Sequence, residues 1–116
     1  MGDVKSAIRQ RLEMLRGLGE NHGGEGEKAP NQRSFDYAFE VLATHYVGVP
    51  FVTTFSSNGE AVFEFHGNGK YTYADITFLD DGSVSCYRQV EGKASEQFIV
   101  PHTSDKFTLF FQQLVG

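Results

Sequence analysis

The chain has 116 residues and a formal net charge of −5, with ten Lys and Arg against fifteen Asp and Glu. This length supports one compact core, and the acidic balance argues against nucleic-acid binding because affinity for phosphates depends on clustered basic residues. The single cysteine, Cys86, excludes an intrachain disulfide, and without a membrane-length or secretory apolar stretch we expect a cytoplasmic protein with no membrane partner.

The first predicted element is an amphipathic helix over residues 1–16. Its apolar residues Val4, Ile8, Leu12 and Leu15 recur at near-helical spacing. The same segment carries four basic and two acidic side chains, a net charge of +2, whereas the rest of the chain carries −7. This contrast leaves three alternatives: the helix docks on the acidic body of its own chain, docks on an acidic partner, or stands in solvent with its charges hydrated.

A flexible linker is predicted over residues 17–33, because five glycines fall between positions 17 and 26 and almost no residue there is apolar. We expect a single α+β domain to follow over residues 34–116. Its first helix begins with Ser34 as the N-cap and ends before Gly48 and Pro50. The stripe that this helix turns toward a sheet recurs at four, three and four residues: Phe35, Phe39, Leu42 and Tyr46.

Four turn signals between positions 51 and 100 predict an antiparallel meander of five strands. They are Asn58-Gly59, Gly67-Asn68-Gly69, Asp80-Asp81-Gly82 and Glu91-Gly92-Lys93. Beyond them, Ser104 and Asp105 predict the cap of a last helix. Its apolar residues follow helical spacing: Phe107, Phe110, Phe111 and Leu114. The predicted fold class is therefore α+β, a five-stranded antiparallel sheet with helices packed on one face.

Turn geometry predicts the register of the hairpin around positions 67–69. A two-residue Asn68-Gly69 loop places Glu64 opposite Tyr73 and His66 opposite Tyr71. All four side chains then lie on the side of the sheet away from the apolar residues.

The next hairpin is predicted to turn through a three-residue loop that ends in a left-handed Gly82. This register pairs Asp75 with Tyr87 on the outer side, whereas a two-residue loop would turn Tyr87 inward. It also sets Arg88 on the core side opposite Ala74. A guanidinium is tolerated there only near a rim, where it can reach water or a carboxylate.

The outer side of the sheet is the candidate functional site. Tyrosines among acidic neighbours are typical of a recognition surface, because a rigid ring offers contact area while its hydroxyl tolerates water. The alternative is that Tyr only has a high strand propensity and pairs well across strands. The candidate partner-binding residues are Glu64, His66, Tyr71, Tyr73, Asp75, Tyr87 and Gln89.

The sequence supports no catalytic, cofactor or metal site. The four histidines stand at positions 22, 45, 66 and 102 with one cysteine, and no metal motif can be assembled from them. Cys86 is expected to point into the core, where a thiol is inert. The best catalytic alternative joins Glu64 and Asp75 with His66 and Tyr73, and it would need a pocket that raises a carboxylate pKa.

Residues 58–65 read NGEAVFEF, residues 73–78 read YADITF, and residues 81–87 read DGSVSCY. Together they resemble a family of uncharacterised small bacterial and phage-associated α+β proteins. That family shows a turn glycine, a strand ending in Glu-Trp, a strand of Leu-Glu-Ile-Glu type, and Asp-Gly-Ser before a strand with Tyr. Here Phe65 stands in place of the Trp and Asp75 in place of the first acidic residue. The resemblance covers roughly residues 49–92 and implies a non-enzymatic accessory protein.

These features predict a non-enzymatic binding or inhibitory module of the immunity-protein, antitoxin or phage-inhibitor type. The expected partner is a basic protein, because complementary charge steers association and aromatic anchors hold the complex. One alternative is a small acidic secretion-type chaperone, which would form a homodimer. The other is an enzyme that uses the outer-face carboxylates.

Overall fold

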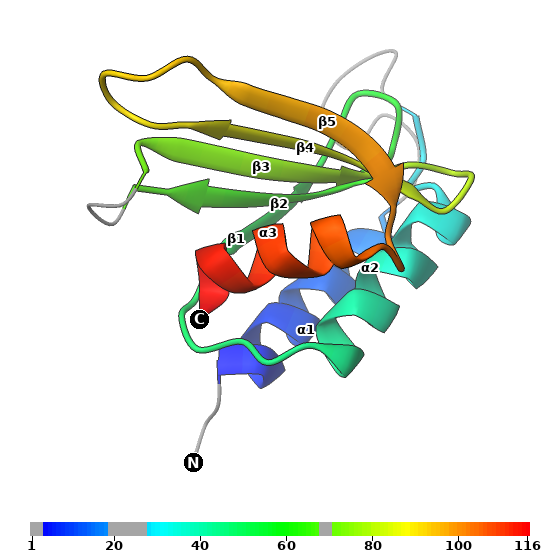
Figure 1. Cartoon of the computed structure of the whole chain (residues 1–116). Coiled ribbons are helices and arrows are strands. Elements are labelled where there is room, and N and C mark those ends of the chain that lie inside the picture. The colour runs from blue at the N-terminus through cyan, green and yellow to red at the C-terminus, as the bar shows by residue number, and fades with distance from the viewer. Residues whose placement is uncertain (1–3, 19–27, 68–70) are drawn as a thin grey trace.

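The computed structural model describes residues 4–18, 28–67 and 71–116. Five antiparallel strands form one sheet in the order β1-β2-β3-β4-β5, and the three helices lie together on one side of it (Figure 1). The predicted α+β class and the meander are confirmed. The elements are α1 (Val4–Arg16), α2 (Gln32–Thr44), β1 (Val52–Phe55), β2 (Ala61–His66), β3 (Tyr73–Phe78), β4 (Ser83–Gln89), β5 (Glu96–Pro101) and α3 (Asp105–Val115).

Helix α1 docks on its own chain, which is the first of the three alternatives. Ile8, Leu12 and Leu15 are buried in the same core as the residues of the sheet and the other helices. At the end of α1, Arg16 pairs with Asp36 of α2, and its guanidinium lies 5.3 Å from the centre of the Phe39 ring (distance measured from Cζ). The apolar spacing of α1 therefore marks the face of the helix that is buried. Residues 19–27 of the predicted linker lie outside the described part of the chain.

The start of α2 differs from the prediction, because Asn31 rather than Ser34 is its N-cap. The Asn31 side chain accepts a hydrogen bond from the backbone N–H of Ser34 at 3.0 Å, and asparagine is among the strongest capping residues. Ser34 is fully buried instead. Its hydroxyl donates to the carbonyl of Phe78 and accepts from the N–H of Ala61 at 2.8 Å. The serine thus ties the helix to two strands.

The end of α2 also comes earlier than predicted. The helix ends at Thr44, and His45 adopts an extended backbone with φ −116° and ψ 150°. Phe35 and Leu42 are buried as expected, but Tyr46 lies beyond the helix and is 69 % exposed. The prediction that Tyr46 belongs to the buried stripe is wrong, because the helical period ends before that residue.

The register between β3 and β4 is confirmed. Asp75 pairs with Tyr87 and Ala74 pairs with Arg88, and Gly82 takes a φ of +91° in the turn. That left-handed conformation is accessible to glycine at little steric cost. The three-residue loop therefore sends Tyr87 to the outer side.

Arg88 makes the rim contacts that its inward position requires. Its Nη2 lies 2.5 Å from Oε1 of Glu96, and its Nη1 donates to Oε1 of Gln113 at 2.9 Å. The guanidinium also lies over the ring of Phe110 on α3, with Cζ at 5.1 Å from the ring centre. The charge is thus paired at the edge of the core.

The register between β2 and β3 differs from the prediction by two residues. Glu64 pairs with Asp75 and His66 pairs with Tyr73, and the N–H of Gly67 donates to the carbonyl of Thr72 at 3.0 Å. The loop is therefore longer than two residues, and its positions 68–70 lie outside the described part. A shift of two keeps the paired side chains of β2 and β3 on their predicted faces, because the side-chain period of a strand is two.

Candidate protein-binding face

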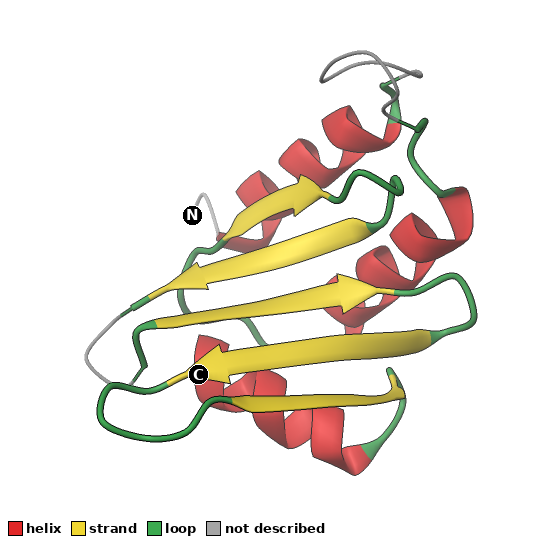
Figure 2. Cartoon of the chain, turned by 90° about the horizontal axis from the view of Figure 1, so that it is seen from above, coloured by secondary structure: helices red, strands yellow, loops and turns green. Residues whose placement is uncertain are grey.

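No described helix covers the side of the sheet away from α1, α2 and α3, and Figure 2 looks onto that side with the helices behind the strands. We call this side the open face and define it by the outward side chains of the five strands. The outward positions of the described strands carry two carboxylates and one histidine, and no Lys or Arg. The outward residues are Val52, Thr54, Val62, Glu64, His66, Tyr73, Asp75, Thr77, Ser83, Ser85, Tyr87, Gln89, Gln97, Ile99 and Pro101.

Two carboxylates stand directly opposite each other at the centre of this face. Glu64 on β2 pairs with Asp75 on β3, and Asp75 pairs in turn with Tyr87 on β4. Like charges at directly opposed positions destabilise a sheet. Burial raises the pKa of the Asp75 carboxyl, and the negative charge of Glu64 raises it further, while a hydrogen bond from Tyr73 partly opposes both. The arrangement therefore costs the free protein folding free energy.

Aromatic rings flank the two carboxylates. The ring centres of His66 and Tyr73 are 5.6 Å apart, and those of Tyr73 and Tyr87 are 6.2 Å apart. Burial raises the pKa of the Tyr73 hydroxyl, and the charge of Asp75 and the hydrogen bond to it raise that pKa further. Tyr73 therefore stays a neutral hydrogen-bond donor toward Asp75. His66 lies at the rim, with Nε2 3.9 Å from Oε1 of Glu64.

The structure brings together six of the seven predicted partner-binding residues. Gln89 is exposed and pairs with Tyr73, so it extends the group formed by Glu64, His66, Asp75 and Tyr87. The prediction that Tyr71 lies on the open face is wrong. Tyr71 precedes β3, is 8 % exposed and packs in the core cluster. The longer loop frees it from strand pairing, and burial raises the pKa of its hydroxyl.

Two apolar residues of the open face were missing from the predicted site. Val52 on β1 is 47 % exposed and Ile99 on β5 is 62 % exposed, and both point outward by the register. The alternation of β5, in which Phe98 and Val100 point inward, is the signal that could have found Ile99. The acidic centre of the face thus has exposed apolar residues toward both edge strands.

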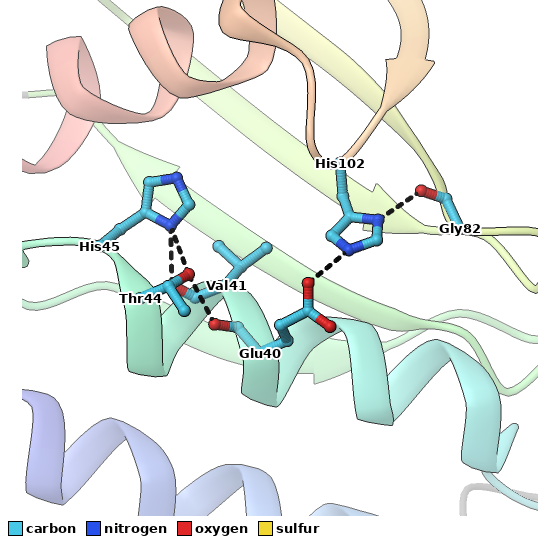
Figure 3. A network of polar contacts seen from close by, with 6 residues as sticks. All are labelled: Glu40, Val41, Thr44, His45, Gly82 and His102. Atoms are coloured by element: carbon cyan, nitrogen blue, oxygen red, sulfur yellow. Dashed lines mark hydrogen bonds and ion pairs between the residues drawn. The ribbon is translucent and has the colours of Figure 1, made fainter.

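A second polar network, away from the open face, joins three segments beside the core (Figure 3). His102 contacts the carbonyl of Gly82 through Nδ1 and a carboxylate oxygen of Glu40 through Nε2, each at 2.7 Å. Nearby, Nδ1 of His45 lies 3.0 Å from the carbonyl of Val41. The partners of His102 lie 20 and 62 residues away in sequence, so no local pattern could have predicted them, whereas the Val41 contact of His45 is local to the end of α2. His102 joins α2 to the turn between β3 and β4, and the His45 ring packs edge-on against Phe107 and Phe111 of α3.

Among the residues that the structure describes, no group of three or more His, Cys, Asp or Glu side chains could hold a metal ion. His22 lies outside the described part. None of the described helices is long and apolar enough to cross a membrane. The chain matches no protein-family model, no curated protein and no solved structure. The family resemblance of residues 49–92 therefore stays a prediction.

Cys86 is expected to resist thiol reagents in the folded protein. Its side chain is buried, and burial raises its pKa to about 12, so the reactive thiolate is scarce at neutral pH. Mass spectrometry after iodoacetamide treatment should show an unmodified chain in buffer and complete modification in urea. Rapid modification in buffer would mean that β4 opens or that the thiol faces solvent.

Asp75→Asn is expected to raise the free energy of unfolding by about 0.5 kcal/mol at pH 7, because it removes a partly buried charge and the repulsion between that charge and Glu64. A raised native-state pKa means that the folded wild type binds this proton more tightly than the unfolded chain does. Wild-type stability therefore recovers as the pH falls through the pKa that Asp75 has in the folded protein. The advantage of the variant should vanish below about pH 4, as urea denaturation at several pH values would show.

Asp81→Asn is the matched control, and its expected effect on the free energy of unfolding at pH 7 has the opposite sign. Hydrogen bonds from Ser83 lower the pKa of the Asp81 carboxyl, so this carboxylate stabilises the fold at neutral pH and that contribution is lost as the pH falls. The Asn variant should be less stable than the wild type at pH 7 and equal to it in acid. A stabilising Asp81→Asn, or a destabilising Asp75→Asn, would contradict the electrostatic account.

Proposed function

We propose that this protein is a non-enzymatic binding or inhibitory module that meets a basic protein partner through its open face. The observation that carries the proposal is the opposed pair of Glu64 and Asp75, with no Lys or Arg at the outward positions of the described strands. Two adjacent carboxylates repel each other in the free protein. A cationic partner relieves that repulsion and gains two acceptors of charge-assisted hydrogen bonds.

The neighbours of the carboxylates support the same proposal. Tyr73 and Tyr87 are half-buried on the face and held by cross-strand packing, so they offer contact area at a low cost in side-chain entropy. The net charge of −5 adds long-range attraction for a basic protein. Charge then steers the encounter, and the aromatic residues supply anchors.

An immunity protein, an antitoxin or a phage-encoded inhibitor has this mode of action. We place the protein in the cytoplasm, where its one thiol stays reduced. A secretion-type chaperone is the alternative within the binding class, and it requires a homodimer. Sedimentation equilibrium bears on this choice, because an obligate dimer would favour the chaperone.

The proposal is tested by capture of a partner on the immobilised protein, followed by affinity measurements with paired variants. Glu64→Gln with Asp75→Asn, and separately Tyr73→Ala with Tyr87→Ala, should each weaken the captured complex by about tenfold or more. Glu13→Gln with Glu91→Gln is the control, because it changes the net charge equally at exposed positions off the open face. Unchanged affinity of both face variants would overturn the proposal.

A further inference from the structure

A hollow of about 300 Å³ lies at the rim of the open face, beside the edge strand β1. We call it the edge hollow, and its lining residues are Pro50, Phe51, Val52, Glu64 and His66. Val52 and Glu64 are register partners on β1 and β2, so an apolar side chain and a carboxylate stand next to each other in its lining. The hollow is thus continuous with the proposed binding face.

The lining of the edge hollow combines apolar residues with one carboxylate. Pro50 and Val52 are exposed, while Phe51 is half-buried and is held by ring contacts to Phe63 at 4.6 Å and Phe65 at 4.8 Å. Because Phe63 and Phe65 belong to the core, the Phe51 ring packs on the core side and anchors this end of β1 before anything binds.

Glu64, the one carboxylate of the lining, has unused hydrogen-bonding capacity. The side chain of Glu64 is 32 % exposed, and its closest described partner is His66, whose Nε2 lies 3.9 Å from Oε1. That separation exceeds a hydrogen bond. A carboxylate can accept several hydrogen bonds, including a bidentate pair. Glu64 therefore keeps its oxygens available to a donor that enters the hollow.

We propose that the edge hollow receives an arginine side chain of the basic partner, an inference that rests on the proposed function. An arginine combines an apolar stem, which can lie along Pro50 and Val52, with a planar cation. That plane can offer two parallel N–H donors to Glu64. Lysine fits less well, because its ammonium is strongly hydrated and cannot bind a carboxylate in a bidentate way.

A blocked peptide, acetyl-Gly-Arg-Gly-amide, tests the inference on the full chain by NMR titration at low salt. We expect saturable shifts of the amides of Phe51, Val52 and Glu64. The citrulline analogue keeps the shape but lacks the charge, and it should bind about tenfold more weakly. Glu64→Gln should weaken the arginine peptide by about fivefold or more, whereas Glu13→Gln should not. The lysine analogue should bind more weakly than the arginine peptide.

A second variant tests the hollow without touching its carboxylate. Val52→Arg adds a guanidinium at an exposed position of the lining, and it should abolish binding of the peptide. The inference is overturned if the shifts do not saturate, if Glu64→Gln binds like the wild type, or if lysine binds as tightly as arginine. Shifts centred on Tyr87 and Asp75 alone would overturn the edge hollow and leave the open face standing. The proposed function itself fails only in the partner-affinity experiment.

Discussion

Phe111→Ala is expected to lower the free energy of unfolding by about 3–5 kcal/mol. Phe111 on α3 has no exposed surface, and its ring stacks on Phe107 with centres 5.7 Å apart. It also meets Phe63 and Phe65 of β2, at 6.4 and 6.3 Å between ring centres. Truncation opens a cavity where helix and sheet meet, and rigid neighbouring rings cannot collapse into it.

Urea denaturation of Phe111→Ala beside Leu109→Ala measures this effect. Leu109 lies on the same helix but is 63 % exposed, so its truncation should change the free energy of unfolding by no more than about 0.5 kcal/mol. Alanine has the highest helix propensity, so neither substitution weakens the helix through its backbone preference. Equal losses in the two variants would mean that α3 does not pack on the sheet as described.

Ser34→Ala is expected to cost about 2–3 kcal/mol of unfolding free energy. The buried hydroxyl bonds to backbone groups of two strands, the carbonyl of Phe78 and the N–H of Ala61. Alanine leaves that N–H without its partner in the dry core, and an unsatisfied buried group is more costly than the loss of an exposed hydrogen bond.

Two alanine variants provide the comparison for Ser34→Ala. Ser95→Ala lies in an exposed turn and should be neutral. Asn31→Ala removes the N-cap of α2 and should cost about 1 kcal/mol. Thermal and urea denaturation should therefore rank the three variants with Ser34→Ala as the least stable. If Asn31→Ala proves the more damaging, Ser34 has little part in joining the helix to the sheet.

Local patterns in the sequence were sufficient for most of the fold. The spacing of Phe107, Phe110 and Phe111 predicted α3, and the cap at Ser104 is present, with its hydroxyl 3.2 Å from the N–H of Phe107. Gly82 predicted its hairpin because a left-handed residue fixes the loop length. Each of these signals is complete within a few residues, so long-range structure is not needed to interpret it.

Two of the errors arose where two local solutions were equally consistent. Asn31 and Ser34 are both good N-caps, and the burial of Ser34 depends on strands 27 and 44 residues away. In the β2–β3 hairpin, two registers that differ by two residues place the same side chains outward. The open face was therefore predictable, but the opposition of Glu64 and Asp75 was not, because it depends on the register itself.

The order of the elements along the chain also bears on which surface is covered last. All five strands are synthesised before Phe107, Phe110 and Phe111 of α3. Until α3 docks, the inward phenylalanines of β2 have no aromatic partners from that helix. A sheet that forms before α3 docks presents an uncovered apolar surface, and partly folded states of that kind are the ones most prone to aggregate.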